Sequence, residues 1–544
     1  MKNSGHWYQD AVFYELYLRA FYDSNGDGHG DLPGLIQRLD YFQYLGVDCI
    51  WLLPFYPSPL KDDGYDVADY YNILPAYGTL EDFKELVAAV HTRGMRLIID
   101  LVMNHTSDQH PWFHQARGSK DSPYRDYYVW RDTDRKYREA RIIFLDTETS
   151  NWAWDEVASQ FYWHRFYSSQ PDLNYENPAV RAEMLEIVKF WLDLGVDGFR
   201  ADAVPYLFER EGTNCENLPE THEYLKEVRK YIDENYPGRI LLAEANQWPE
   251  DVREYFGDGD EFHMGFHFPV MPRIFMALRK GDRSPIKWIL EKTPPIPEPC
   301  QWCIFLRNHD ELTLEMVTEE EREWMWNEYA PDKRMRLNLG IRRRLAPLLD
   351  NDRRKIELAN SMLFTLSGSP ILYYGDEIGM GDNIELPDRN GVRTPMQWDK
   401  TLNSGFSKAI PEKLYDPVIE GSEYGPDQVN VESQKQDPRS LLNKIRHMIR
   451  IRRQLPALKG GKMVWIDTGV EAIAAYWRIM GDARLMVVNN LSAKKQTATI
   501  DLDSNDNIAW KDQLTERVYT IDHEQVLPLN LEPYEYRWFM AEAS

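Results

Sequence analysis

The sequence predicts an α/β protein: a closed (β/α)8 TIM barrel with two insertions, followed by a small antiparallel β domain. Three observations lead to this prediction. A unit made of an amphipathic helix, a glycine-containing turn and a short apolar strand recurs between residues 32 and 377. The strands are nearly all apolar, which is typical of parallel strands covered by helices on both sides. Beyond about residue 456 the pattern changes to alternating apolar and polar residues, which is typical of antiparallel strands.

The repeated unit predicts most of the barrel. The expected helix and strand pairs are 32–46 with 47–55, 80–94 with 95–105, 180–195 with 196–204, 222–238 with 239–246, and 356–368 with 369–377. Apolar segments at 12–18, 262–268 and 303–311 complete a set of eight strands, which is the number that closes a TIM barrel. A doubly wound open sheet is the alternative, but no glycine-rich phosphate loop follows the first strand.

Two segments interrupt the repeat and define the domains. Residues 105–175, rich in Tyr, Trp, Asp, Arg and Ser, are expected to form a lobe inserted after the third strand, over the barrel mouth. Residues 311–350 are expected to form a charged, largely helical insertion after the seventh strand. The catalytic barrel would then cover 1–104 and 176–455. A C-terminal β-sandwich would cover 456–544, with strands in AIAAYWRIM, ARLMVVNNLS, KQTATIDL and YEYRWFMA.

Composition and charge exclude several function classes. The 544 residues carry a net charge of −25, whereas a nucleic-acid interface needs clustered Lys and Arg, so no nucleic-acid partner is expected. No segment has the roughly 20 apolar residues of a membrane helix, so no membrane partner is expected. The N-terminus lacks a signal-peptide pattern and four cysteines provide no disulfide framework, so we expect a cytoplasmic protein. Whether the chain forms a homo-oligomer stays open.

Polar and charged side chains follow several of the expected strands. A charge at the end of a buried strand is costly unless it is paired or used, and barrel enzymes place their chemistry at the carboxyl ends of their strands. These ends are therefore expected to meet in an active site. The residues concerned are Asp100, Asn104, Arg200, Asp202, Glu244, His309 and Asp310.

Four ordered motifs resemble the α-amylase superfamily of glycoside hydrolases. They are DLVMNH (100–105), GFRADAV (198–204), AEAN (243–246) and RNHD (307–310). Each motif alone is weak, but all four occur in order at strand ends, and the resemblance covers nearly the whole chain. It implies a retaining glycoside-processing enzyme that uses two carboxyl groups, one as nucleophile and one as general acid/base.

The resemblance implies roles for three carboxylates. Asp202 would be the nucleophile and Glu244 the acid/base, whose pKa a water-poor pocket would raise. Asp310 would bind sugar hydroxyls and stabilise the distorted transition state. The structural alternative is that each carboxylate forms a buried salt bridge, although too few cations accompany the three to make that the better interpretation.

Further residues would bind the substrate. Arg200 lies two residues before Asp202, so both side chains point to the same side of a strand, and Arg200 would keep Asp202 ionised. By resemblance, His105 and His309 would hydrogen-bond the sugar beside the nucleophile. The GYD segment would place Tyr65 under the sugar and Asp66 on its 4-hydroxyl, with Arg393 of RTPMQW as the partner of Asp66. That pair would close the pocket around one terminal glucose. Gln170, in QPDLN, is a further candidate for substrate binding.

Two cation sites are expected, and no organic cofactor. DSNGDGHGD places polar residues at alternate positions, and such a loop can surround a hard cation with oxygen ligands. It resembles the calcium or magnesium loop of oligo-1,6-glucosidases, although a solvated turn is the alternative; its residues are Asp23, Asn25, Asp27, His29 and Asp31. A second set resembles the calcium site that joins the inserted lobe to the barrel in trehalose synthases. Its members would be Asn104, Asp172, the carbonyl oxygens of Tyr206 and Leu207, and Glu209.

A finer resemblance is to the trehalose synthases, which interconvert maltose and trehalose by intramolecular transfer of a glucosyl group. The segments that match are QPDLNYENP (170–178), FRADAVPYLFERE (199–211), GIRRRLAPLL (340–349) and MGDNIELPDRNGVRTPMQW (380–398). The resemblance implies maltose and trehalose as substrates, a covalent glucosyl–Asp202 intermediate and minor hydrolysis to glucose. Candidates for holding the freed glucose are Arg389, Glu311, Asn246 and Tyr206.

Other functions stay open at this stage. An α-glucosidase similar to oligo-1,6-glucosidases, or an enzyme similar to sucrose isomerases, would share the barrel motifs and a QPDLN-like segment. A non-catalytic barrel, such as the ectodomain of amino-acid transporter heavy chains, would be expected to have lost carboxylates and to carry a membrane helix. The products formed from maltose would distinguish the isomerase from the α-glucosidase.

Overall fold

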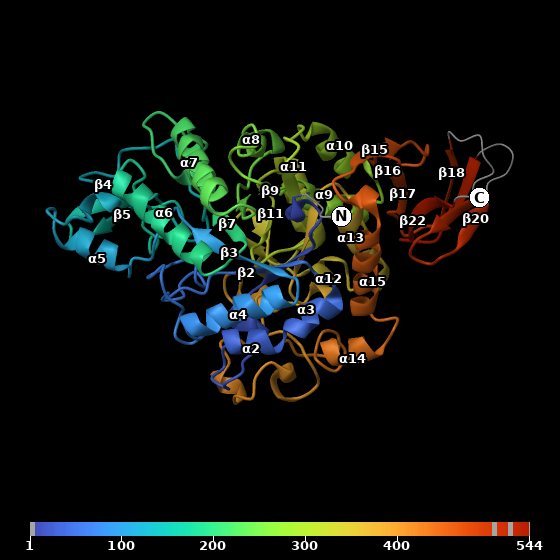
Figure 1. The fold of residues 1–544 in the computed structure, drawn as a ribbon, viewed down its shortest axis with the longest axis horizontal. Coiled ribbons are helices and arrows are strands. Elements are labelled where there is room, and N and C mark those ends of the chain that lie inside the picture. Colours follow the sequence, from blue (N-terminus) through green and yellow to red (C-terminus); the bar gives the residue numbers. More distant parts are fainter. Residues whose placement is uncertain (1–5, 503–508, 521–525, 543–544) are drawn as a thin grey trace.

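The computed structural model describes residues 6–502, 509–520 and 526–542. Eight parallel strands form a closed barrel in the order β1-β14-β10-β9-β8-β7-β3-β2 (Figure 1). Each strand overlaps a segment predicted from sequence, although β10 begins two residues before its predicted segment, so the predicted barrel is confirmed. The strands are β1 (Phe13–Leu16), β2 (Cys49–Leu52), β3 (Arg96–Val102), β7 (Gly198–Asp202), β8 (Ile240–Ala243), β9 (Met264–Phe266), β10 (Gln301–Phe305) and β14 (Ser369–Tyr373).

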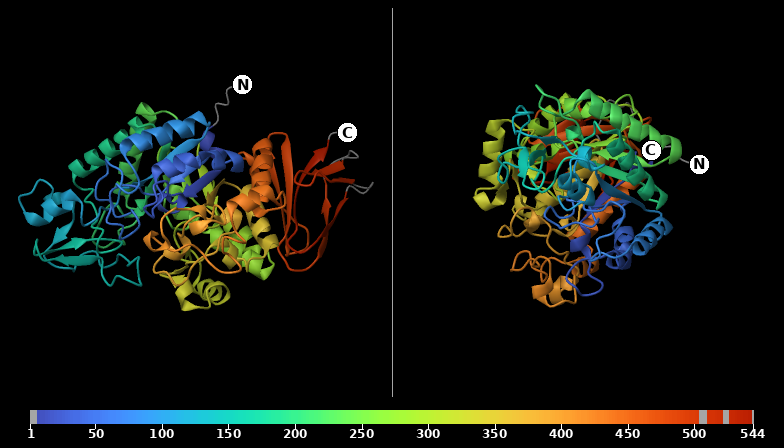
Figure 2. Two further views of the ribbon diagram at one scale, coloured as in Figure 1. Left: turned by 90° about the horizontal axis from the view of Figure 1, so that it is seen from below. Right: turned by 90° about the vertical axis from the view of Figure 1, so that its left-hand side faces the viewer.

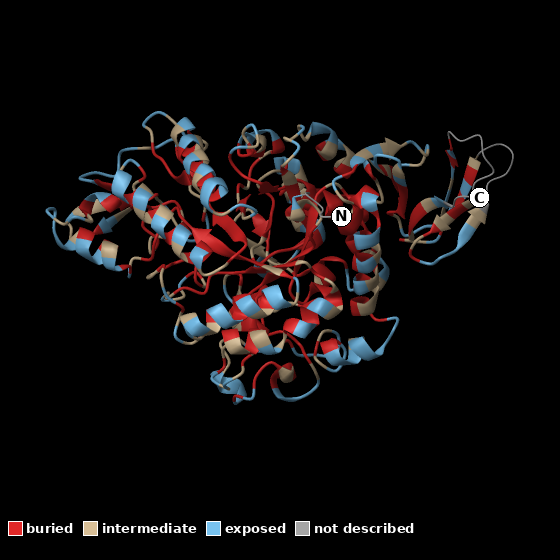
Figure 3. Ribbon diagram, viewed as in Figure 1, coloured by how far each residue is buried: buried red, intermediate tan, exposed pale blue. Residues whose placement is uncertain are grey.

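Amphipathic helices cover the outside of the barrel. Burial is concentrated in the strands and on the inner faces of the helices (Figure 3). Local sequence sets the helix starts: Thr79 and Asp82 form a capping box before one helix, and Asn177 caps another that begins with proline. The main barrel helices are α2 (Leu32–Gln37), α3 (Leu39–Leu45), α4 (Leu80–Thr92), α6 (Pro178–Asp193), α7 (Pro219–Asn235), α8 (Pro249–Glu254), α9 (Val270–Lys280), α10 (Ser284–Lys292), α13 (Arg353–Thr365), α14 (Val431–Gln436) and α15 (Leu441–Gln454).

The lobe that follows β3 lies at one end of the molecule, opposite the C-terminal domain (Figure 2). It contains a helix and a three-stranded antiparallel sheet in the order β4-β6-β5. Aromatic rings hold it together; for example, Phe113 stacks on Trp130 at 5.6 Å. Its elements are α5 (Pro111–Gly118), β4 (Trp130–Arg131), β5 (Trp152–Asp155) and β6 (Gln160–Trp163).

The insertion after β10 is less helical than predicted. Its main helix, α11 (Glu319–Tyr329), begins at a capping box made by Thr318 and Glu321. A small three-stranded sheet, β11-β13-β12, accompanies α11. These strands are only two residues long, too short to show a period in sequence. They are β11 (Leu312–Thr313), β12 (Arg336–Leu337) and β13 (Gly340–Ile341), and the insertion ends with the helix α12 (Leu345–Leu348).

The C-terminal domain is an antiparallel sandwich of a six-stranded sheet, in the order β15-β16-β17-β22-β19-β20, and the pair β18-β21. Its own core includes Ile473, Val488, Leu529 and Phe539. Along the described residues, no helix is both long enough and apolar enough to cross a bilayer. The strands are β15 (Lys462–Ile466), β16 (Ile473–Met480), β17 (Ala483–Asn490), β18 (Gln496–Asp501), β19 (Ala509–Asp512), β20 (Val518–Thr520), β21 (Val526–Leu531) and β22 (Tyr536–Glu542).

Candidate active site

A cavity of about 760 Å³, including space open to solvent, lies at the carboxyl ends of the barrel strands. Its walls are formed by the strand ends, the inserted lobe, the insertion after β10 and the loop at 380–398. The lining residues are Asp62, Tyr65, His105, Ile143, Phe144, Phe166, Arg200, Asp202, Tyr206, Glu244, Asn246, Phe268, His309, Asp310, Glu311, Thr313, Glu315 and Arg389.

Asp202 lies at the end of β7 with Arg200 on the same side of the strand, as their spacing predicts. One guanidinium nitrogen of Arg200 donates to Asp202 and also to Asp100 on β3, at 2.6 Å from the latter. Asp100 accepts a further hydrogen bond from Trp51 at 2.7 Å. Burial raises the pKa of Asp202 to about 6 against the opposing effect of Arg200. Arg200 thus favours the ionised form that a nucleophile needs.

Glu244 follows β8 and faces the same guanidinium. Its Oε2 lies 4.0 Å from a nitrogen of Arg200 and accepts the backbone N–H of Ala203 at 2.9 Å. Burial, assisted by the nearby charge of Asp202, raises the pKa of Glu244 to about 7. The two carboxyl groups lie against one cation. A raised pKa of Glu244 is what a general acid requires.

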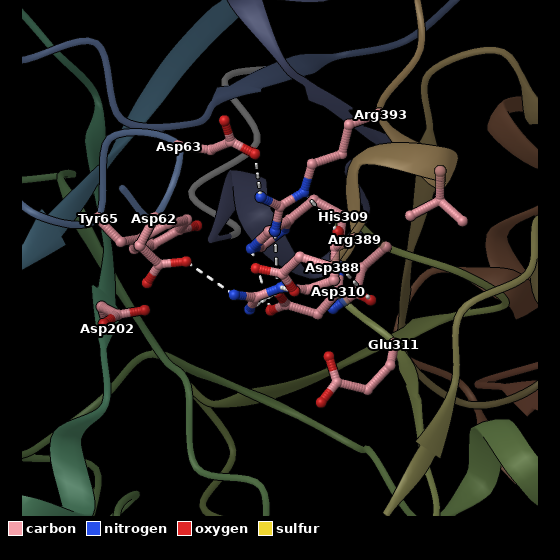
Figure 4. Close-up of polar contacts among 12 residues, drawn as sticks. Asp62, Asp63, Tyr65, Asp202, His309, Asp310, Glu311, Asp388, Arg389 and Arg393 are labelled. Carbon is pink, nitrogen blue, oxygen red and sulfur yellow. Dashed lines mark hydrogen bonds and ion pairs between the residues drawn. The ribbon is translucent and has the colours of Figure 1, made fainter. Parts of the chain in front are cut away.

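Asp310 is the third carboxylate in the wall of the cavity, where it lies beside Arg389 and Arg393 (Figure 4). It accepts from Arg389 at 2.8 Å and from Arg393 at 3.1 Å, and it lies 3.1 Å from Nε2 of His309. Burial alone would raise the pKa of Asp310, but these three cationic groups hold it well below its usual range. The ring of Tyr65 stacks on His309 at 5.3 Å, where it can form the floor for a sugar. Asp310 is therefore an ionised hydrogen-bond acceptor in the wall of the cavity.

The predicted pair of Asp66 and Arg393 is wrong. Asp66 is fully buried and turns away from the cavity, because its oxygens accept the backbone N–H groups of Lys61 and Asp62 and so close their turn. Asp62 lines the cavity in its place and accepts from Arg389 at 2.7 Å (Figure 4). Sequence spacing could not decide between neighbouring aspartates and arginines on the same two loops.

Arg393 supports the site from behind. It donates to Asp63 at 2.7 Å and to the carbonyl oxygen of His309 at 2.9 Å, and it is not among the residues that line the cavity. Gln170 is also set back: it is fully buried and donates to Asp62 at 2.8 Å. Both residues thus position groups that line the cavity instead of lining it themselves.

The remaining predicted substrate residues all line the cavity. His105 is buried, which lowers its pKa to about 4, so it is neutral. Asn246 donates to Thr313 at 3.0 Å, and its buried carbonyl oxygen has no partner. Glu311 accepts from Asn338 at 3.2 Å. Tyr206 enters the wall from the segment after β7.

The sequence prediction missed a bridge between the two insertions. Arg141, in the inserted lobe, contacts Glu315 beyond β11 at 2.6 Å, Glu216 at 2.9 Å and the hydroxyl of Tyr206 at 3.2 Å. Glu315 and Tyr206 line the cavity. The bridge therefore closes part of the cavity rim. No local pattern in the sequence marks Arg141, since it lies in an irregular segment.

Apolar walls from the lobe were also missed. Ile143, Phe144 and Phe166 line the cavity together with Phe268 from the segment after β9. Phe144 contacts the guanidinium of Arg389 at 5.4 Å from the ring centroid. Aromatic and aliphatic walls exclude water and strengthen the electrostatic interactions inside the site. A run of aromatic residues was visible in this segment, but not which of them faces inward.

The second predicted cation site contains three buried side-chain oxygen atoms that lack a hydrogen-bond partner. These atoms are Asn104 Oδ1, Asp172 Oδ2 and Glu209 Oε1. Burial raises the pKa of Glu209 well above its usual range, and the adjacent Asp172 raises it further. Unpaired buried acceptors that repel one another are costly unless a cation binds them. Carboxylate and amide oxygens are the ligand types that a hard cation such as calcium prefers.

The loop at 23–31 fits a cation less well. Asp23 accepts backbone N–H groups of the loop at 2.7–3.1 Å, and the side chains of Asn25 and Asp27 each accept the N–H two residues ahead. Asp31 accepts from Ser24 and Gly34. Nδ1 of His29 accepts from Arg19, so only its carbonyl oxygen could bind a cation. Within the described residues no three His, Cys, Asp or Glu side chains converge on a metal position, so amide and carbonyl oxygens would be needed.

Comparison with known proteins identifies the family to which this chain belongs. A family model described as alpha amylase, catalytic domain, matches residues 15–461, and one described as maltogenic amylase, C-terminal domain, matches residues 464–538. The trehalose synthase/amylase TreS of Mycobacterium tuberculosis (strain ATCC 25618 / H37Rv) is 61% identical over 503 residues, which cover 91% of this chain and 84% of that protein. The trehalose synthase of Pimelobacter sp. (strain R48) is 59% identical over 509 residues, covering 91% and 89%.

Solved structures agree with the sequence relatives. The trehalulose synthase MutB from Pseudomonas mesoacidophila MX-45 superposes with a TM-score of 0.81 at 28% identity, covering 98% of this chain and 99% of that one. A mutant of MutB in complex with the substrate sucrose superposes equally well. The match covers the barrel and the C-terminal domain together. The chain therefore belongs to the α-amylase family, and within it to the trehalose synthases.

Proposed function

We propose that this protein interconverts maltose and trehalose by moving a glucosyl group within one bound disaccharide. The observation that carries the proposal is the set of groups that bound the cavity. Asp202 and Glu244 face it, the Asp62–Arg389 pair bounds one part of it, and the Arg141 bridge holds two separate insertions over its rim. The identity to proteins named trehalose synthase supports the same activity.

In the first half-reaction, the carboxylate of Asp202 attacks the anomeric carbon of the non-reducing glucose of maltose. The bond from that carbon to O4 of the second glucose breaks, and Glu244 donates its proton to the departing oxygen. Arg200 holds Asp202 ionised and in position for the attack. The products are a covalent glucosyl–Asp202 ester, an ionised Glu244 and one free glucose in the cavity.

In the second half-reaction, the freed glucose turns and presents its anomeric hydroxyl to the ester. Glu244 takes the proton from that hydroxyl, the oxygen attacks the anomeric carbon, and the bond to Asp202 breaks. Two inversions retain the α configuration of the transferred glucose and yield trehalose. Asn246, Glu311 and Tyr206 line the cavity and supply polar groups for the turning glucose.

Exclusion of water distinguishes the isomerase from an α-glucosidase. The glucosyl–Asp202 ester reacts either with the trapped glucose or with water, and trapped glucose is present at high effective concentration. Maltose should therefore give trehalose as the main product, with free glucose as a minor one. Labelled glucose added outside should enter trehalose slowly. Chromatography of the products, with counting of the label, tests this; glucose as the dominant product would favour the α-glucosidase.

The same assay can test the closure directly. Arg141→Ala removes the bridge to Glu315 and leaves Asp202 and Glu244 in place, so the share of free glucose should rise several-fold more than total maltose consumption falls. Arg138→Ala, at an exposed arginine of the same lobe, is the matched control. Arg389 is a poor choice, since its loss would also free Asp62 and Asp310. Equal product ratios in both variants would contradict a closing role for Arg141.

We further propose that a calcium ion binds between the lobe and the barrel, and that the loop at 23–31 holds calcium or magnesium. A cation at 100 times its Kd stabilises the folded state by about 2.7 kcal/mol. Chelation should therefore lower Tm while leaving the initial rate on maltose nearly unchanged, because both sites lie outside the catalytic carboxylates. Differential scanning calorimetry with and without EDTA measures the shift.

Two variants assign the effect of chelation to one site or the other. Asp172→Asn should make Tm insensitive to EDTA if the site between lobe and barrel is responsible. Asp27→Asn should do so if the loop is responsible. An unchanged Tm after verified removal of metal from the unmodified protein would reject both sites.

A further inference from the structure

Glu15 is a buried carboxylate at the centre of the barrel that the proposed mechanism does not use. It lies on β1, is fully buried, and is not among the residues that line the cavity. Its Oε1 accepts the backbone N–H of His309 at 3.0 Å and lies 2.5 Å from Nδ1 of the same residue. Its Oε2 has no partner. His309 supplies the backbone N–H and the ring nitrogen that contact this side chain, and a buried carboxyl group needs such partners.

His309 is held between two carboxylates. Nδ1 faces Glu15 and Nε2 lies 3.1 Å from Asp310. Because an ionised carboxylate only accepts hydrogen bonds, both ring nitrogens have to donate, and a histidine that donates from both nitrogens is the imidazolium cation. The two ion pairs thus select the charged form of a side chain that is itself 1% exposed.

Other groups near Glu15 and His309 affect the protonation of the imidazole but do not reverse it. The Tyr65 ring stacks on the imidazole, and Arg393 donates to the carbonyl oxygen of His309 at 2.9 Å. Burial lowers the pKa of His309, yet the two carboxylates outweigh burial and raise it to about 9. The charged or titratable groups that face Glu15 and His309 are Asp310 and Arg307 beside the ring, Asp100 on β3, Tyr65 after β2, Tyr373 on β14 and Arg393 on the 380–398 loop.

We propose that Glu15 is a positioning residue that keeps His309 as an imidazolium, with its Nε2–H directed at Asp310 and at a sugar hydroxyl bound beside it. This inference rests on the proposed function only for the identity of the sugar. The pair Glu15–His309 acts through geometry and charge: it orients the ring from β1, and it places a fixed cation next to Asp310. That cation keeps Asp310 ionised as an acceptor, although Asp202 and Glu244 lie in the same cavity.

Glu15→Gln is the sharpest test, since the amide oxygen can still accept from His309 but the negative charge is gone. The imidazole should then lose its proton at lower pH, and a fall of about two pKa units changes the protonated fraction at pH 8 roughly tenfold. kcat/KM is measured for total maltose consumption, counted as trehalose plus glucose. The value for Glu15→Gln divided by the value for the unmodified protein should fall about tenfold between pH 6 and pH 8. Counting both products makes the result independent of which reaction dominates.

The protonation of His309 can be measured without any activity. In protein labelled with 15N-histidine, the His309 signal, assigned by its absence in His309→Gln, should show two protonated nitrogens at pH 8. In Glu15→Gln the same signal should show one. Glu377→Gln is the control, because Glu377 is equally buried but accepts from Tyr14 and Tyr41, away from the cavity. A neutral His309 in the unmodified protein at pH 8, or an unchanged signal and pH profile in Glu15→Gln, would overturn the proposal.

Discussion

Asp202→Asn should reduce turnover of both maltose and trehalose by a factor on the order of 10⁴ to 10⁶, the range seen when single residues of a catalytic triad are removed. Both directions of the isomerisation pass through the same glucosyl ester, so both should be lost together. The amide keeps the shape of the carboxylate but has no anionic oxygen to attack the anomeric carbon. Initial rates with each disaccharide, measured on purified protein, test the prediction.

A matched control distinguishes loss of the nucleophile from loss of fold. Asp197→Asn changes a buried aspartate next to the other end of the same strand, where it pairs with His91 and Arg96. That variant should lose stability but keep activity at temperatures below its Tm. Substantial activity in purified Asp202→Asn would instead remove Asp202 from its proposed role.

Chemical rescue gives the nucleophile assignment a stereochemical test. In Asp202→Ala, azide can occupy the space that the carboxylate leaves and attack α-glucosyl fluoride from the opposite face. A single displacement inverts the anomeric centre, so the product should be the β-glucosyl azide. An α-glucosyl azide from this variant would mean that another group still forms a covalent intermediate.

The barrel strands and the two carboxylates Asp202 and Glu244 could be predicted from sequence, because burial and the alternation of side chains along a strand leave clear local patterns. A strand that is buried on both faces is apolar, so a carboxylate at its end stands out, as Asp202 and Glu244 do after β7 and β8. The alternation of side chains along a strand places Arg200 beside Asp202 without any structure. The geometry of these residues agrees with their predicted roles, and the roles themselves await the experiments described.

The errors arose where residues of one type crowd into a single loop. Asp62, Asp63 and Asp66 lie within five positions, and Arg389 and Arg393 within another five. Which of them meet depends on the path of both loops through space. Asp66 accepts backbone N–H groups of its own turn, which frees Asp62 for the cavity. No residue type or spacing in the sequence carries that information.

Contacts between the insertions were beyond sequence reasoning for a related reason. Arg141 and Glu315 are 174 positions apart, and both lie in segments without a regular period. Glu15 lies in the predicted first strand, but nothing in the sequence shows that it pairs with His309. Long-range ion pairs thus contribute the charged contacts around the cavity, whereas the barrel follows from the periodic pattern of apolar residues in the sequence.

The second large effect should appear at Glu244. Glu244→Gln cannot protonate the departing oxygen of maltose or trehalose, so turnover of both should fall by about 10²- to 10⁴-fold, the usual contribution of general acid–base catalysis. The first half-reaction of α-glucosyl fluoride should survive, because fluoride departs with little protonation. Glu261→Gln, at a buried glutamate before β9 that pairs with His222, is the matched control and should retain activity on maltose.

The course of fluoride release separates the two roles of Glu244. In Glu244→Gln, Asp202 should displace fluoride once per active site, and the ester should then accumulate, since no base activates glucose or water. A burst equal to the enzyme concentration, followed by a slow phase, is the expected trace. Azide needs no deprotonation, so it should restore turnover and give the α-glucosyl azide, the product of two inversions. Loss of the burst in Glu244→Gln, with maltose and fluoride equally impaired, would assign the acid role to another residue.

The pH profile of the unmodified enzyme tests both ionisations. The value of kcat/KM on maltose should fall above about pH 7, because Glu244 deprotonates, and below about pH 6, because Asp202 becomes protonated.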